Sequence, residues 1–414
     1  MSSYLEVKKQ LEKYWFSYLN ENSKRFSSST ISGASPPSVF VGRYGYPKIS
    51  IGPMVPADVH GNTSILDSPE GWVGKTLQEI LNYRLSLVRG LNSIKIDDLD
   101  NKFILSLQEL TMSSKPAESE LNFHKIPTFY QSLLLSHQNN DLNKEFTPFG
   151  PQAEIKSFKL SSSTSTNKKI DNLYSDTTVK ATDAVIDLYN NGIEISQINK
   201  VLSLGMLGRK KRHLVPTRWS ISATDDIISS YLVKKIDLYQ SIDKFEVIKY
   251  NHFSNYYSII FIPSDVWSFE MVEAWYDQNN NGNKFFLESD NESATGLDHY
   301  PRIAGAYFAA KLGIVEYLSS YRKRKCSVLV LREIRPEYLV PLGVWQIREG
   351  IRDALRSKQA TTGSNTNSFS DFKKSLLYAS KEMTVPLLEW LRHSEIYKNY
   401  RKKTLISDFF EKEI

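Results

Sequence analysis

The stretch from Phe245 to Glu288 constrains the fold more than any other part of the chain, because its residue types are those of β-strands. Four runs rich in β-branched and aromatic residues follow one another there, separated by turn-forming Asn, Gly and Pro. The runs are 245–250, 256–262, 267–276 and 284–288. Consecutive strands are most often neighbours in a sheet, so the pattern predicts an antiparallel meander.

Helical patterns lie on both sides of this stretch, with apolar residues at the three- and four-residue spacing of an amphipathic helix. Helices are predicted at 77–88, 103–111, 178–189, 198–204, 226–238, 301–318, 344–355 and 372–391, the last interrupted by Pro386, and further strands within 35–56 and at 327–334. These elements predict an α+β fold, in which an antiparallel sheet with surrounding helices carries loop insertions and a flexible C-terminal tail.

The single cysteine, Cys326, excludes an intrachain disulfide and any cysteine cluster around zinc or an iron–sulfur centre. The N-terminus carries charges where a secretory signal needs an apolar run, and no stretch has the ~20 apolar residues of a membrane-spanning helix. These features predict a cytoplasmic protein without a membrane partner. A formal net charge of +6 permits nucleic-acid binding without requiring it.

Several separated blocks of the sequence resemble the archaeal Nre family of DNA-repair proteins. The blocks are Ser35–Pro53 with its continuation Asp67–Trp72, Arg212–Asp226, Pro301–Gly313 and Arg332–Glu349, and the similarity covers roughly residues 30 to 395. Their order makes chance similarity improbable. The resemblance implies a role in repairing damaged DNA in an archaeal cell, with a nucleoid-associated location, through interaction with the sliding clamp (PCNA). It does not define a chemical step.

This sequence departs from the family pattern at its N-terminus. Many members carry a four-cysteine, zinc-ribbon-like module there, and the corresponding region of this chain contains no cysteine. We therefore expect no zinc finger and no zinc-based DNA binding. The sequence identifies no cofactor.

The resemblance also divides the chain into four predicted regions. An amphipathic helix occupies 1–29, a region of the Nre N-terminal type 30–295, a region of the Nre C-terminal type 296–395, and a tail 396–414. The segment from about 113 to 176 is rich in Ser, Asn and Lys and weakly periodic, which predicts flexible surface loops inserted into the second region.

The tail carries a pattern typical of clamp-binding peptides. An aliphatic residue, Ile406, is followed at three and four positions by Phe409 and Phe410, so that one helical turn presents a single apolar plug. A glutamine usually stands three residues before the aliphatic residue, and Lys403 stands there instead. The basic run before it favours attraction to an acidic clamp. The alternative is a terminal helix that folds back on its own protein.

A glycine-containing turn is predicted within the first family block. Its aromatic and cationic residues are suited to stacking on a base or holding a phosphate, and they are Arg43, Tyr44, Tyr46 and Lys48. The alternative is that the tyrosines pack in the interior. The glycines match neither a dinucleotide-binding fingerprint nor a phosphate-binding P-loop.

A basic run beside a tryptophan lies at the start of the central family block. Such a combination is suited to phosphate contacts with base stacking, and its members are Arg209, Lys210, Lys211, Arg212, His213, Arg218 and Trp219. The alternative is a solvated charged face. The seven histidines of the chain show no metal-ligand spacing.

Carboxylates near the family blocks are candidates for acid–base or divalent-metal chemistry. They are Asp225, Asp226 and Glu333, with Glu349 and Asp353 nearby in sequence. Helix caps and ion pairs explain them equally well, since Asp225 and Asp226 stand at the predicted helix start and Glu333 lies between two arginines. No familiar hydrolase, zinc-protease or nuclease motif is present.

Two functions follow from these patterns. The first is a DNA-damage repair factor whose body binds nucleic acid or nucleotide and whose tail docks on the sliding clamp, which raises its local concentration at DNA. The second is an enzyme acting on DNA or a nucleotide, a nuclease or transferase, with a pocket lined by the 43–48 and 212–226 blocks. The second function requires that the two blocks meet in space.

Overall fold

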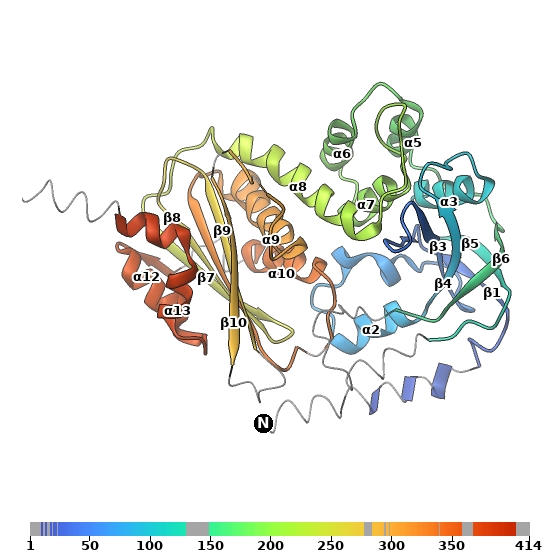
Figure 1. Cartoon of the computed structure of the whole chain (residues 1–414), viewed down its shortest axis with the longest axis horizontal. Helices are drawn as coiled ribbons and strands as arrows, with labels where there is room; N and C mark the ends of the chain where they lie inside the picture. The colour runs from blue at the N-terminus through green and yellow to red at the C-terminus, as the bar shows by residue number, and fades with distance from the viewer. Residues whose placement is uncertain are drawn as a thin grey trace, which may run out of the picture. The chain divides into compact units, whose positions relative to one another are not determined.

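The computed structural model describes residues 10, 13–14, 17–18, 20–22, 24–129, 149–276, 284–293, 295–297, 299–338, 340–357 and 367–402. They fall into two compact units, which Figure 1 colours along the chain. The N-terminal unit contains the described residues of Lys9–Ile228 and Val340–Gly343. The C-terminal unit contains those of Ser229–Leu339 and Val344–Ile414.

A six-stranded sheet forms the centre of the N-terminal unit. Its strands are β1 (Thr30–Ser35), β2 (Val39–Val41), β3 (Lys48–Pro56), β4 (Leu87–Lys95), β5 (Ala117–Phe123) and β6 (Gln152–Leu160), and they lie in the order β1-β5-β6-β4-β3-β2. All neighbouring pairs are antiparallel except β4 and β6, which are parallel. The two strands predicted within 35–56 are confirmed as β2 and β3.

Short helices accompany this sheet. They are η1 (Ser64–Asp67), η2 (Pro69–Gly71), α2 (Leu77–Leu85), α3 (Lys102–Met112), α5 (Lys168–Ser175), α6 (Ala181–Asn190) and α7 (Ile195–Ser203). α2 begins with a capping box, in which the hydroxyl of Thr76 accepts from the Glu79 amide and the Glu79 carboxylate accepts from the Thr76 amide. This helix places Leu81 and Leu85 in a buried cluster with Leu121.

The prediction of flexible loops over 113–176 was wrong for β5, β6 and α5. In β5 alternate residues are buried, but these include Ala117 and Ser119, so the segment looks polar in sequence. β5 is stabilised by pairing with β1, which is remote in the chain. Hydrophobic periodicity reports burial only where the buried side chains are themselves apolar.

The C-terminal unit is built on a second six-stranded sheet. Its strands are β7 (Phe245–His252), β8 (Asn255–Ile262), β9 (Ser268–Tyr276), β10 (Phe285–Glu292), β11 (Ser327–Ile334) and β12 (Asn367–Phe369), in the order β10-β9-β11-β8-β7-β12. All four predicted runs are strands. The predicted uninterrupted meander was wrong, because β11 lies between β8 and β9 and is parallel to β9.

The position of β11 has a physical reason. Every residue of β11 is buried, as a strand covered on both faces and paired on both edges requires. β8 and β9 therefore pair with the two edges of β11. The pairs β7–β8 and β9–β10 remain antiparallel hairpins. The sequence predicted the strand at 327–334 but carried no information on its neighbours.

Helices cover both faces of this second sheet. α9 (Gly305–Glu316) and α10 (Trp345–Arg356) lie on one face, and α12 (Phe372–Ala379) and α13 (Leu387–His393) lie on the other (Figure 1). The predicted interruption at Pro386 is confirmed, since α12 continues into η5 (Ser380–Glu382) and α13 starts after that proline. A π-helical turn, η4 (Tyr317–Arg322), follows α9 directly.

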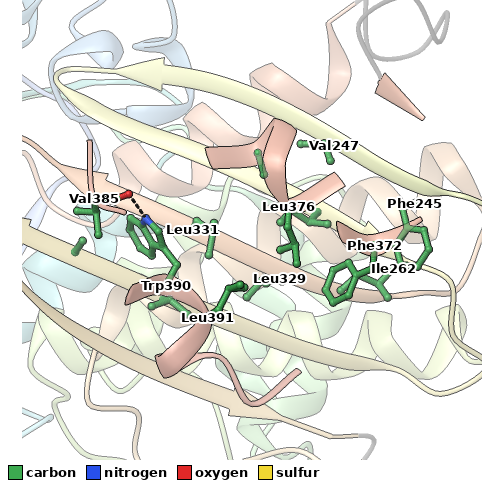
Figure 2. Packing of buried hydrophobic residues seen from close by; sticks show 14 residues of the cluster. Phe245, Val247, Ile262, Leu329, Leu331, Phe372, Leu376, Val385, Trp390 and Leu391 are labelled. Atoms are coloured by element: carbon green, nitrogen blue, oxygen red, sulfur yellow. Dashed lines mark hydrogen bonds between the residues drawn. The ribbon is translucent and has the colours of Figure 1, made fainter. Parts of the chain in front are cut away.

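An apolar cluster holds α12 and α13 on the sheet. Figure 2 shows Leu329 and Leu331 of β11 facing side chains from both helices, among them Leu376 and Trp390. The Trp390 indole is fully buried, and its Nε1 donates to the Val385 carbonyl oxygen at 3.2 Å. Large apolar surface thereby leaves water, and the indole N–H keeps a partner.

Two buried carboxylates of the sheet complete this attachment. Glu333 accepts from the backbone amides of Thr384 and Val385, at 2.8 and 3.0 Å. Glu270 accepts from the Ser394 hydroxyl and from two backbone amides that follow it. Burial raises the pKa of Glu270, and the hydrogen bonds from Ser394 and the backbone oppose that rise.

The α+β class is confirmed by this arrangement. α8 (Thr217–Ile236) starts nine residues before the predicted 226, so Asp225 and Asp226 lie inside the helix and the prediction that they stand at its start was wrong. Among the described residues, no helix is long and apolar enough to cross a membrane. Most of the predicted N-terminal helix lies outside the described residues.

Candidate nucleic-acid interface

The turn between β2 and β3 presents two tyrosines to solvent. Gly45 adopts a positive φ of 86°, which a glycine tolerates without a Cβ clash, and its carbonyl accepts from the Lys48 amide at 2.9 Å. The side chains of Tyr44 and Tyr46 are 78% and 55% exposed. The alternative in which these tyrosines pack in the interior is therefore excluded.

The first turn of α8 lies beside this turn. The Val41 amide donates to the Thr217 hydroxyl at 2.9 Å, and the rings of Tyr46 and Trp219 lie 6.2 Å apart. A further backbone link runs from Leu214 through Ile96 to Pro47. The structure thus brings together the 43–48 turn and the 213–219 part of the central block, which the pocket hypothesis required.

Cationic side chains accompany the exposed rings. The Arg43 guanidinium lies 5.0 Å from the centre of the Tyr44 ring and donates to its hydroxyl. Lys48 pairs with Lys95 across β3 and β4, both are exposed, and neither forms an ion pair among the described residues. Like charges directly opposite each other repel, and a bound anion would relieve that repulsion.

Six exposed residues of the two segments and of β4 form a surface that we call the aromatic patch. Its members are Arg43, Tyr44, Tyr46, Lys48, Lys95 and Trp219. Sequence reasoning missed Lys95, because its place opposite Lys48 depends on the strand register. The available signal was its position at the polar, exposed end of β4, which does not identify a cross-strand partner.

The basic run before α8 divides into two parts. Arg212 donates to the carbonyl oxygens of Gly208, Tyr174 and Asp176, each at 2.7 Å, so its guanidinium is occupied in joining loops. Arg209 likewise donates to a backbone carbonyl, that of Thr178. The side chains of the other members, Lys210, Lys211 and His213, are exposed, and Arg218 is half-buried.

The candidate acid–base residues are divided between the two units. Asp225 is buried within α8 and Asp226 is half-buried there. Glu333 belongs to the C-terminal unit, and both of its carboxylate oxygens accept hydrogen bonds from the segment before α13. Within the described part of the chain, no group of three or more potential metal ligands is assembled.

Comparison with known proteins identifies the family. The sequence-family model described as "Archaeal Nre, N-terminal" matches residues 12–280 of this chain. The family model described as "Archaeal Nre, C-terminal" matches residues 292–409. DNA repair protein NreB of Archaeoglobus fulgidus is 35% identical over 91% of each chain, and NreA of the same organism is 34% identical over 86% of each. NreA of Haloferax volcanii is 31% identical over 80% of this chain and 79% of its own. No solved structure matches. The chain therefore belongs to the archaeal Nre family.

Proposed function

We propose that this protein acts in DNA repair by binding single-stranded DNA through the aromatic patch, and that its C-terminal peptide recruits it to the sliding clamp. The repair role is supported by the relatives, which are named DNA repair proteins and match most of the chain. This role requires binding alone and no chemical reaction on the DNA.

The observation that carries the proposal is the meeting of exposed rings with exposed cations. Tyr46 and Trp219 come from separate segments, and each leaves about half of its surface in water, a large exposed apolar area for side chains of this kind. A base that stacks on such rings removes this area from water, and nearby lysines neutralise its phosphates. Bases are available for stacking in single strands, which favours single-stranded over duplex DNA.

Replacing Trp219 or Tyr46 with alanine is expected to weaken the binding of single-stranded DNA by about 1–3 kcal/mol each, the contribution of one stacked base. The Lys48→Gln/Lys95→Gln pair is expected to reduce the slope of log affinity against log salt by about 0.7 for each phosphate that the variant no longer neutralises. Fluorescence anisotropy with a labelled oligonucleotide, over a salt series, measures both.

Tyr300, an exposed tyrosine of the C-terminal unit, provides the matched control. Tyr300→Ala removes a comparable ring outside the aromatic patch and should leave DNA affinity unchanged. Equal losses for Tyr300→Ala and Trp219→Ala would contradict the proposed surface, as would undiminished binding by Trp219→Ala. Thermal unfolding of each variant separates loss of binding from loss of folding.

The residues of the proposed clamp peptide, Lys403, Ile406, Phe409 and Phe410, lie outside the described residues. Phe409→Ala/Phe410→Ala is expected to abolish binding to the clamp from the same cell in calorimetric titration, because both aromatic anchors of the plug are removed. The unfolding temperature should not change. As a control, Glu411→Ala, next to the plug, should bind the clamp like the unchanged chain. Clamp binding that persists in the double variant, or failure of that variant to fold, would refute the proposed clamp peptide.

An enzyme acting on DNA is the second candidate, since the two blocks that would line its pocket do lie side by side. The exposure of the rings favours an open binding surface over an enclosed site. Incubation of end-labelled single-stranded DNA with the protein and a divalent cation distinguishes the two functions. A product that disappears in the Trp219→Ala variant would establish the enzyme, whereas binding without product supports the binding factor.

A further inference from the structure

A second cationic site lies within the N-terminal unit. Arg89 is on β4, between β3 and β6, and its guanidinium carbon lies 4.9 Å from the centre of the Phe40 ring and 4.1 Å from that of Phe149. Two aromatic faces therefore hold the guanidinium. Phe40 belongs to the first family block, but no pattern in the sequence connects it with Arg89.

The Arg89 side chain is buried, and one of its three nitrogens is enclosed without a partner. It is 8% exposed, its Nε has no hydrogen-bond partner, and no carboxylate pairs with it among the described residues. Burial lowers the pKa of Arg89 to about 10, so it remains charged at neutral pH. Buried charges in proteins are normally paired, because a lone one loses its hydration.

The guanidinium of a second arginine lies against one of the same rings. Arg84 of α2 lies 5.9 Å from the centre of the Phe149 ring and 5.2 Å from that of Trp72. Phe149 thus lies against two arginines. The rings of Phe40 and Phe149 attract the Arg89 cation, but they supply no hydrogen-bond acceptor to its N–H groups.

We propose that Arg89 is the anchor of a binding site for an oxyanion of the phosphate class, carried by a nucleotide or by the end of a DNA strand. A guanidinium matches the oxygens of a phosphate with two parallel hydrogen bonds. Phe40 and Phe149 are only half-buried, which leaves ring surface beside the phosphate for a base.

This site is distinct from the aromatic patch and does not rest on the proposed function. The patch consists of exposed side chains that follow a strand of DNA, whereas Arg89 is buried and takes one anionic group. The difference predicts opposite effects on stability. Removing an exposed lysine should leave folding unchanged, while removing a buried unpaired charge should stabilise the ligand-free protein or leave it unchanged.

The first experiment measures the effect of inorganic phosphate on the full chain in a phosphate-free buffer. The unfolding temperature of the unchanged protein should rise with phosphate concentration, because a ligand that binds the native state stabilises it. Arg89→Met, which keeps the length and apolar packing of the stem, should lose at least about tenfold in phosphate affinity, as expected for a charged hydrogen-bond donor. Its unfolding temperature without phosphate should equal or exceed that of the unchanged protein.

Two further variants keep the result interpretable. Arg89→Lys retains the charge and should fold, with phosphate affinity between those of the unchanged protein and Arg89→Met, because a lysine cannot form the paired hydrogen bonds. Lys102→Gln, at an exposed lysine of α3 outside the aromatic patch, should keep the full phosphate response. Equal phosphate affinity of Arg89→Met and the unchanged protein would overturn the proposal, as would the absence of any response in the unchanged protein.

The source of the phosphate is decided by competition. A nucleoside monophosphate, a 5′-phosphorylated oligonucleotide and the same oligonucleotide with a 5′-hydroxyl are each titrated against bound phosphate in the unchanged protein and Arg89→Met. Preference for the 5′-phosphorylated strand, absent in Arg89→Met, identifies a DNA end. Displacement by the monophosphate alone identifies a nucleotide, and displacement by none of the three would overturn the assignment to phosphate esters.

Discussion

Replacing Glu273 with alanine is expected to lower the free energy of unfolding by about 3–5 kcal/mol, the cost of leaving a buried charge without its partner. Glu273 of β9 accepts from Arg332 of β11 at 2.5 Å, and both side chains are buried. Two other nitrogens of Arg332, Nε and Nη2, donate to the Asn255 side-chain oxygen, at 3.0 and 2.7 Å. Among the described residues Glu273 is the acidic group that pairs with Arg332, so its removal leaves the guanidinium without a counter-charge.

The electrostatics of Arg332 agree with this expectation. Burial alone lowers its pKa, but Tyr257 and Glu273 more than offset that effect, and the pKa of Arg332 lies above its usual value. The native state therefore depends on the negative charge of Glu273. Urea unfolding followed by far-UV circular dichroism measures the loss.

A double substitution tests whether the cost comes from the unpaired charge. Glu273→Leu/Arg332→Met replaces the pair with apolar side chains of similar volume and should be much more stable than Glu273→Ala. Glu288→Gln, which breaks an exposed pair with Arg302 at the same sheet, should have no measurable effect. A double variant as unstable as Glu273→Ala would show that the loss arises elsewhere.

Trp390→Ala is expected to cost about 3–5 kcal/mol of unfolding free energy, in the range for removal of a buried aromatic side chain. The indole fills the space between α13 and the sheet and is surrounded by apolar residues of β11 (Figure 2). Its removal leaves a cavity that the neighbouring strands cannot close. The same urea titration measures the change.

Trp390→Phe separates the two contributions of this side chain. It keeps most of the apolar volume and removes the hydrogen bond to the Val385 carbonyl, so the expected cost is about 1–2 kcal/mol. Hydrogen exchange should show faster exchange in α12 and α13 of Trp390→Ala and little change in the N-terminal unit. A loss for Trp390→Ala no larger than that for Trp390→Phe would contradict the packing argument.

Local sequence patterns were sufficient to predict many of the helices, but they did not predict where α8 starts. The segment from Thr217 to Thr224 is rich in Ser and Thr, whose side chains compete for backbone hydrogen bonds, so it looked unlike a helix. In the structure Ser220 is buried and bonds Ser203. The hydrogen bond to Ser203, the last residue of α7, thus outweighed the low helix propensity of this segment.

Residue types and local spacing were sufficient to predict the family, the α+β class, the break at Pro386 and the strand character of β7 to β11, because these features depend on segments of a few turns. The position of β11, the burial of Arg89 and the proximity of Tyr46 to Trp219 became known only from the fold. Each of these depends on contacts between remote segments, such as the hydrogen bond between Val41 and Thr217, which are 176 positions apart. Periodicity shows that a side chain is buried or exposed, but the partner that it meets is set by strand order and register.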